Sequence, residues 1–361
     1  MAGFDVSLPW VILSPAGIKA AESAAADISH YIDLLRLKAG KGLPPPKVID
    51  ANGPAPDDSV PVILLNSRGG SLDRNGFTWR AGRERIEIYG NSDRGLCRGV
   101  YDFLGALGIR WPSPESEETP SPPSRDGLTY SEYPLASDKA YAASSVDFRE
   151  RKRFLLGKGE KPKKQERLIR WAARTGCDAL VVSLLEKRIP PAVERYALVV
   201  ERGGHEISLL VPRRLFLFKR RIFAMAGGKR VKRRHFCPTD PDTGKVIAKE
   251  GKILFSAALA AWKTKNTAPC SLIINLWPDR DAADQWCSCP ACRAFSAKEQ
   301  YSMAVNIAAD TLSELDPEAK IGCLIPPVPQ DEALPEKGIP LRSNVAILQE
   351  EHGKKHAEQQ H

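Results

Sequence analysis

Apolar residues spaced three and four apart predict two amphipathic helices in the first third of the chain. The first helix follows an apolar run at 10–13 that is typical of a short strand, and Ser14 and Pro15 fit its N-cap and first turn. Its apolar positions are Ile18, Ala21, Ala25, Ile28, Ile32 and Leu35. The second helix carries Leu96, Val100, Phe103, Leu104 and Leu107 and is expected to end at Gly108, a residue suited to a left-handed cap.

Short apolar runs between these helices predict strands. Residues 62–65 are all apolar, as in a buried strand, whereas 77–79 and 86–88 alternate apolar and polar side chains, as in half-buried strands. We therefore predict a compact α/β domain over 1–113. The following residues are rich in Pro, Ser and Glu and lack apolar periodicity, so 114–145 are predicted to be a linker.

Helical and strand-like segments alternate in the rest of the chain. Helices are predicted at 163–175, 246–263 and 297–315, and strands at 179–183, 206–210, 271–276, 321–324 and 345–348. Ser296 and Glu299 form a capping box at the start of the last helix. Repeated strand and helix units of this kind predict a parallel sheet or barrel over 146–361.

Length and composition fit a protein of two folded domains. The chain has 361 residues, of which 42% are apolar and 27% are charged. We see no apolar run long enough to cross a membrane and no secretion signal at the N-terminus, so we expect a cytoplasmic protein without a membrane partner.

The positive charge is concentrated in one segment. The net charge is +9, and ten lysines and arginines lie between Glu206 and Asp240 without an intervening acid. Such a segment is compatible with a solvated face, an anionic glycan or nucleic acid. Because Phe216, Phe218 and Phe223 interleave the basic residues, nucleic-acid or anion binding by 213–234 is the alternative function.

Three of the eight cysteines lie in one short loop. Cys287, Cys289 and Cys292 supply three thiols within six residues, and zinc in a structural site takes four ligands. Cys237, in a Phe-Cys-Pro turn, is the best candidate for the fourth. A structural zinc ion is the favoured interpretation, with unligated reduced thiols and redox chemistry as the alternatives.

Two groups of motifs carry a family resemblance. The stretch 91–112, together with Phe77-Thr-Trp79, resembles the N-terminal domain of α-glucuronidases of glycoside hydrolase family 67 and its relatives beside family 20 hexosaminidases. The second half resembles an uncharacterised domain that follows it in bacterial proteins. Its motifs are Gly203-Gly-His205, Phe236-Cys-Pro238, Leu276-Trp-Pro-Asp279 and Trp286-Cys-Ser-Cys-Pro-Ala-Cys292.

The resemblance implies an α/β fold in which a small accessory domain packs beside a TIM-barrel-like (β/α) domain that binds sugar. A complete barrel takes about 250 residues, more than the 216 that remain from Val146. We count about six barrel strands from Ala179 onward, so the barrel is expected to be incomplete. The closing strands, which supply catalytic acids in family 67, would lie past the end of this chain.

Acidic and aromatic residues follow the predicted strand 271–276. Asp279 and Asp281 would lie at the C-terminal edge of a barrel, where carboxyl groups of glycosidases act, and Asp279 is the candidate catalytic residue. Asp281 is a candidate for substrate binding, and Trp277 and Trp286 would suit stacking on a sugar. The alternatives are a solvated acidic turn and two core aromatics.

His205 follows two glycines, which would let the backbone approach a ligand, so it is a candidate sugar-binding residue. Its alternative role is structural. These observations favour a carbohydrate-active protein, either a glycoside hydrolase or a degenerate barrel that binds an oligosaccharide or polysaccharide without cutting it. Whether the chain is an enzyme is left open by the sequence.

Overall fold

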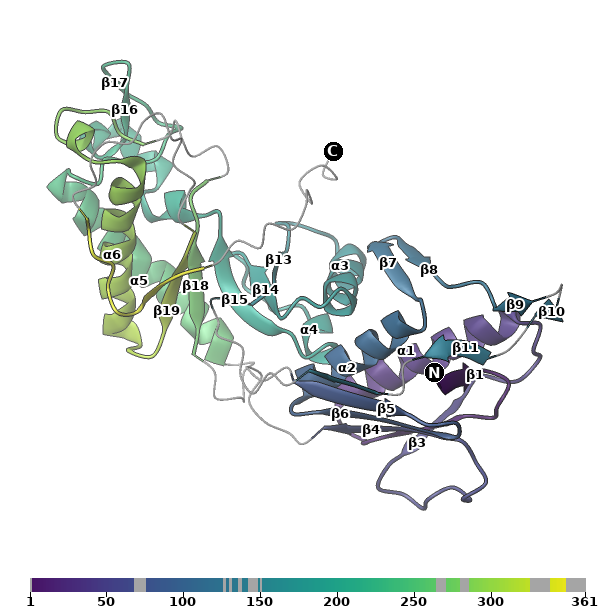
Figure 1. The fold of residues 1–361 in the computed structure, drawn as a ribbon. Coiled ribbons are helices and arrows are strands. Elements are labelled where there is room, and N and C mark those ends of the chain that lie inside the picture. Colours follow the sequence, from purple (N-terminus) through teal and green to yellow (C-terminus); the bar gives the residue numbers. More distant parts are fainter. Residues whose placement is uncertain are drawn as a thin grey trace.

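The computed structural model shows two six-stranded sheets, each with its own helices (Figure 1). The structure describes residues 2–67, 76–125, 128–129, 132–135, 138–141, 149, 151–263, 271–279, 286–324 and 338–348. Within these described residues, no helix is long and apolar enough to span a membrane.

The first sheet is mixed and has the strand order β12-β5-β6-β4-β2-β3. Its strands are β2 (Val11–Ser14), β3 (Lys47–Asp50), β4 (Val62–Ser67), β5 (Phe77–Ala81), β6 (Arg85–Gly90) and β12 (Asp138–Tyr141). Helices α1 (Lys19–Lys38) and α2 (Asp93–Ala106) cover one face of this sheet (Figure 1). Alternate residues of β5 and β6 are buried, including Trp79 and Ile88, which confirms the predicted half-buried strands.

The first helix begins later than predicted. Ser14 is the last residue of β2, and the residue before α1 is Ile18, whose side chain makes no capping hydrogen bond. The intervening turn contains Gly17 with φ +77°, a left-handed conformation that delays the helix. The predicted capping role of Ser14 is therefore wrong. The end of α2 agrees with the prediction, since Gly108 has φ +93°.

The segment predicted as a linker carries strands. The described parts of 114–145 contain β8 (Ser116–Glu118), β9 (Ser124–Arg125), β10 (Leu128–Thr129), β11 (Glu132–Leu135) and β12. Strand β8 pairs with β7 (Arg110–Ser113), β11 pairs with β1 (Ala2–Asp5), and β12 extends the first sheet beside β5. The local β7–β8 and β9–β10 pairs, and the pairing of β11 and β12 with strands distant in sequence, give this segment an order that its composition does not predict. The domain boundaries stay a prediction.

The second sheet is parallel throughout and has the order β13-β14-β15-β18-β19-β20. Its strands are β13 (Arg153–Leu155), β14 (Ala179–Val182), β15 (Val199–Gly204), β18 (Ile273–Leu276), β19 (Lys320–Cys323) and β20 (Val345–Ile347). In the described part of the chain β13 and β20 are its edges. This is the predicted α/β architecture, an incomplete TIM-barrel-like sheet beside a smaller α/β unit.

Helices connect the parallel strands. They are α3 (Pro162–Arg174), α4 (Ala192–Arg195), α5 (Pro241–Lys263) and α6 (Ala297–Leu315), with short 3-10 helices η2 (Ile207–Leu210), η3 (Arg213–Leu217), η4 (Arg220–Ile222) and η6 (Cys292–Ala294). A small hairpin, β16 (Met225–Ala226) and β17 (Lys229–Arg230), projects at the far end (Figure 1). The predicted capping box is present in α6, because Ser296 and Glu299 exchange hydrogen bonds with each other's backbone.

The strand predicted at 206–210 is wrong. Residues 207–210 form the 3-10 helix η2, and the strand lies just before it at β15. Glu201, in the middle of β15, is fully buried and pairs with Arg151 and Arg153 at 3.3 and 2.6 Å. A charged residue inside a strand hides the apolar pattern, and its partners lie about fifty residues away in sequence. His205 consequently lies at the exit of a strand and not at its entry.

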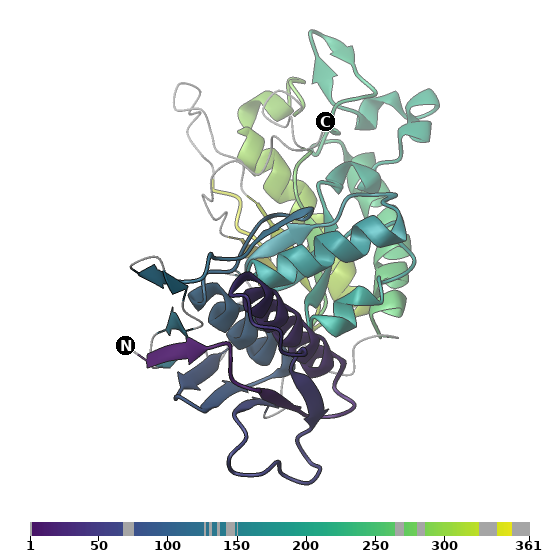
Figure 2. The same cartoon turned by 90° about the vertical axis from the view of Figure 1, so that its right-hand side faces the viewer.

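The helices of the two units pack against each other. Figures 1 and 2 show α1 and α2 between the first sheet and the second unit. Lys19 of α1 pairs with Glu194 of α4 at 2.6 Å, and Arg98 of α2 pairs with Asp178, just before β14, at 3.0 Å. The two units therefore share an interface built from helices.

Replacing Gly203 by Ala is expected to destabilise the fold. Gly203 has φ +100°, and an added Cβ would lie 2.0 Å from the backbone oxygen of Asn275 on β18. The strained φ alone costs roughly 1–3 kcal/mol, and the clash opposes pairing of β15 with β18. Gly227→Ala is the matched control, since its φ is +54° but no atom lies within 4 Å. Equal unfolding free energies of the two variants in urea would contradict this explanation.

Candidate active site and candidate metal centre

The C-terminal ends of β15 and β18 bring together residues that the sequence analysis singled out. Gly204 pairs with Leu276, so His205 and Trp277 are the next residues on neighbouring strands. Their rings lie 5.3 Å apart at 72°, and His205 Nδ1 is 2.5 Å from the backbone oxygen of Pro278. The histidine ring therefore holds the residue immediately before Asp279.

Asp279 has a largely buried carboxyl group. Its side chain is 24% exposed, and Oδ2 lies 3.6 Å from Nδ1 of His235. Burial raises the pKa of Asp279, because the ionised form loses solvation, although a hydrogen bond from Ser208 and the charge of Arg213 oppose the shift. The raised pKa extends the pH range over which the carboxyl group keeps its proton.

His235 faces Asp279 as a neutral ring. It is fully buried, and burial, reinforced by the nearby Arg213, lowers its pKa to about 4. At neutral pH its contact with Asp279 is therefore between an imidazole and a carboxyl group and is not an ion pair between two full charges. Arg213 is itself fixed by donating to the backbone oxygens of Lys232 and Arg234.

Glu206 is a site residue that the sequence analysis missed. Its carboxylate accepts hydrogen bonds from Ser183 Oγ at 2.6 Å and from the backbone N–H of Leu184 at 2.7 Å, and it pairs with Lys158 Nζ at 2.5 Å. The charge of Lys158 also acts on Asp279. Glu206 lies just after β15, a position typical of site residues in such sheets. The sequence did not indicate this position, because the strand was predicted at 206–210.

The two candidate tryptophans are both buried. Trp277 packs with Val181 and Leu348, and its indole N–H has no hydrogen-bond partner in the described part of the chain. Trp286 packs between His235, whose ring centroid lies 4.5 Å away, and Tyr301 at 6.0 Å. The structure thus gives Trp286 the packing of a core aromatic. Asp281 lies outside the described residues, and its role stays a prediction.

The four candidate metal ligands form one buried cluster. The Sγ atoms of Cys237, Cys287, Cys289 and Cys292 all lie within 4.8 Å of one another. Gln300 of α6 orders the loop, since its side-chain oxygen accepts from the backbone N–H of Cys287 at 3.0 Å and its amide donates to the backbone oxygens of Cys287 and Cys292. Folding thus brings the Cys237 turn to the Cys-x-Cys-x-x-Cys loop.

Several arginines of the basic segment 213–234 have contacts within the fold. Besides Arg213, Arg230 donates to the backbone oxygen of Phe223 at 2.7 Å, and Arg214 pairs with Glu250 at 3.3 Å. Most of its basic side chains nevertheless stay exposed, among them Arg221, Lys229 and Arg233, and Phe218 is 86% exposed beside Lys219 and Arg220. The segment therefore still presents a basic surface to solvent.

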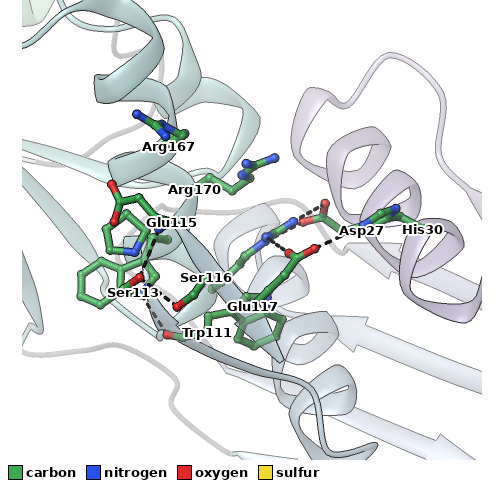
Figure 3. A pocket seen from close by; sticks show the side chains of 12 residues that line it. Asp27, His30, Trp111, Ser113, Glu115, Ser116, Glu117, Arg167 and Arg170 are labelled. Carbon is green, nitrogen blue, oxygen red and sulfur yellow. Dashed lines mark hydrogen bonds and ion pairs between the residues drawn. The ribbon is translucent and has the colours of Figure 1, made fainter. Parts of the chain in front are cut away.

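A pocket of about 420 Å³ lies between α1, the β7–β8 hairpin and α3. Figure 3 shows Asp27 and His30 of α1 on one side and Arg167 and Arg170 of α3 on the other. The sequence gives no local sign of this pocket, because its residues come from three distant segments. Its lining is polar and mixed in charge, and Trp111 and Trp171 add two aromatic side chains.

Arg174 organises the floor of this pocket. Its guanidinium group pairs with Asp27 at 2.8 Å and with Glu117 at 3.4 Å, and it lies 5.3 Å from the ring centroid of Tyr31. Tyr31 donates to Glu117 at 2.6 Å and accepts from Trp111 Nε1 at 2.7 Å. This network joins the two units, and its polar groups are bonded to one another.

Comparisons with known proteins relate the chain to others by fold. No protein-family model matches the sequence, and no curated protein matches it. The chain is similar to the structure of Flavobacterium johnsoniae chitobiase (FjGH20), with a TM-score of 0.52 and 12% identity over 96% of this chain. The match covers 52% of the chitobiase, so this chain spans about half of its length.

Two Streptomyces enzymes give weaker matches. The β-N-acetylhexosaminidase of Streptomyces coelicolor A3(2) has a TM-score of 0.48 and 13% identity, with 96% of this chain and 66% of that chain covered. The Streptomyces plicatus N-acetyl-β-hexosaminidase has a TM-score of 0.48 and 14% identity, with 90% and 62% covered. The likeness in fold that carries weight is the one to the chitobiase FjGH20, and it gives no support to the α-glucuronidase part of the resemblance.

Proposed function

We propose that the C-terminal edge of the parallel sheet binds a saccharide and that Asp279 donates a proton to the glycosidic oxygen as its bond to the anomeric carbon breaks, with water adding to that carbon. The observation that carries this proposal is the buried carboxyl group of Asp279, whose pKa is raised, directly beyond β18. Barrels built from parallel strands carry their chemistry at this edge. A carboxyl group that keeps its proton to higher pH suits the general acid of a glycosidase.

The neighbours of Asp279 support a polar ligand. The indole N–H of Trp277 is buried and lacks a hydrogen-bond partner among the described residues, so a ligand oxygen could satisfy it. His205 lies against the same tryptophan. Sugars combine hydroxyl groups with apolar ring faces, and a site with donors beside aromatic rings matches both properties.

Glu206 and Lys158 act in this proposal as positioning residues. All three partners of Glu206 donate to its carboxylate, which holds the Lys158 ammonium group near the strand ends. That ammonium group would interact with the Asp279 carboxylate after proton transfer. His205, Trp277 and Asp281 remain the proposed substrate-binding residues, whereas Trp286 supports the site by packing on His235.

Thermal unfolding of the purified chain with a panel of ligands tests this function. The panel contains oligosaccharides of N-acetylglucosamine, because the enzymes of similar fold are named for such sugars, together with neutral oligosaccharides, uronic-acid oligosaccharides and a DNA duplex. A ligand at one hundred times its Kd stabilises the folded state by about 2.7 kcal/mol. We expect one saccharide class to raise Tm at both low and high salt.

The same panel tests the second candidate, anion or nucleic-acid binding by 213–234. The exposed Phe218 beside Lys219 and Arg220 is the observation that favours it. Binding through phosphate contacts weakens by about 10³–10⁵ between 50 and 200 mM salt when 6–10 contacts form. Stabilisation by DNA alone, lost at high salt, would replace the saccharide proposal by this one.

A further inference from the structure

The distances within the four-cysteine cluster suit a tetrahedral metal ion. Cys237 Sγ lies 3.7 Å from Cys289 Sγ and 3.6 Å from Cys292 Sγ. Sulfurs joined in a disulfide are about 2.05 Å apart, whereas four sulfurs bound to zinc at about 2.3 Å form a tetrahedron with edges of about 3.8 Å. The observed separations agree with the second arrangement.

The packing around the cluster also favours a metal ion. The buried apolar group at this place consists of Ala224 and the four cysteines, with the half-buried Met225 beside it. It is separate from the core formed by α5, α6 and the parallel sheet. Because this group buries little apolar surface, it stabilises the surrounding loops only weakly. Small units of this kind usually depend on metal ions or cross-links.

Hydrogen-bond donors point at the sulfurs. The backbone N–H of Met225 is 3.2 Å from Cys287 Sγ, and Arg230 Nη1 is 3.6 Å from the same atom. Thr239 Oγ1 lies 3.0 Å from Cys292 Sγ, and its hydroxyl group can donate once that sulfur is a thiolate. Donors around a ligating sulfur stabilise the thiolate form that binds metal and orient it.

We propose that Cys237, Cys287, Cys289 and Cys292 bind one zinc ion as a structural centre. Four thiolates fill the tetrahedral coordination of zinc and leave no open position for a substrate or water, so the centre stabilises the fold and does not catalyse. The inference stands on the cluster alone and does not depend on the saccharide proposal.

The ion would connect two segments, and a third is already bonded to one of them. It joins the turn at Cys237 to the loop before α6, and the loop is already bonded to the β16–β17 hairpin through Ser288 N–H and the backbone oxygen of Met225, at 2.9 Å. Two ligands are close in sequence to His235 and Trp286, whose ring centroids lie 4.5 Å apart. Zinc therefore fixes the wall that His235 forms against Asp279.

Metal analysis of the purified protein tests the proposal. We expect one zinc ion per chain by inductively coupled plasma mass spectrometry, and loss of that zinc in Cys237→Ser and Cys292→Ser. Cys97→Ser and Cys323→Ser are matched controls, because both cysteines are buried and lie outside the cluster. These controls should retain zinc.

Two measurements on the unaltered chain keep the test decisive when a serine variant does not fold. A zinc chelator should lower Tm, and added zinc should restore it. Cobalt(II) taken up in place of zinc should give the charge-transfer and visible bands of tetrahedral thiolate coordination. The proposal would be overturned if the purified chain contained no metal, its four thiols reacted with a thiol reagent in the folded state, and the chelator left its Tm unchanged. A bound iron–sulfur cluster would overturn it as well.

Discussion

Replacing Asp279 by Asn is expected to reduce hydrolysis of a saccharide by about 10²–10⁴-fold, the usual contribution of a general acid. Asparagine keeps the size of the side chain and can accept the hydrogen bond from Ser208, but it has no proton to donate. The rate is measured on the saccharide that the unaltered chain hydrolyses fastest. Asp58→Asn, at an exposed loop position, is the control and should keep the rate.

The same variant should be more stable at neutral pH. The raised pKa means that the folded state disfavours the ionised carboxyl of Asp279 relative to the unfolded chain. Its stability contribution therefore falls as pH rises from about 3.9, the ordinary aspartate value, through the folded-state pKa. In urea unfolding over a pH series, the advantage of Asp279→Asn should vanish at low pH and grow toward neutrality.

Two outcomes would contradict the catalytic role. Hydrolysis at an unchanged rate in Asp279→Asn would exclude Asp279 as the general acid. If neither the unaltered chain nor the variant hydrolysed a saccharide, only the binding part of the proposal would remain.

Replacing Arg174 by Ala is expected to lower the free energy of unfolding by roughly 3–5 kcal/mol, as when one partner of a buried ion pair is removed. The side chains of Arg174 and Asp27 are only 6% and 15% exposed. Burial alone would lower the pKa of Arg174, but the Asp27 carboxylate outweighs this effect and raises it. The variant leaves Asp27 buried without its cation and removes the arginine stacked on Tyr31.

Arg167→Ala is the control for this prediction. Arg167 lies two turns earlier on α3, is exposed, and lines the same pocket. An exposed substitution of this kind changes stability by about 0.5 kcal/mol or less. Chemical unfolding of both variants at neutral pH measures the difference. If they lost the same stability, the Arg174 network would not be what holds the two units together.

Local signals predicted part of the fold accurately. The helix at 297–315 was placed correctly because Ser296 and Glu299 cap it within four residues and its apolar positions repeat at the helical period. The thiol cluster, including Cys237, was also anticipated, because few side chains other than thiols gather in this pattern. In both cases the information lies in a short segment or in the chemistry of one residue type.

The strand predictions failed where a strand depends on residues distant in sequence. Strand β15 was missed because Glu201 needs Arg153, 48 residues earlier, to be buried. Strand β12 joins β5 across about sixty residues, and a segment rich in Pro and Ser gives no local sign of it. The arrangement of Asp279, His235 and Lys158 follows from the same kind of pairing, so the sequence could propose Asp279 but not its neighbours.

Hydrogen exchange measured by mass spectrometry, with and without the saccharide that raises Tm most, tests the central claim most directly. A saccharide bound at the strand ends should protect the backbone at 203–208 and at 273–279, the ends of β15 and β18 beside Asp279. Protection confined to 27–31 and 111–117 would place the saccharide in the pocket between the two units. That result, or protection confined to 213–234, would contradict a saccharide site at Asp279.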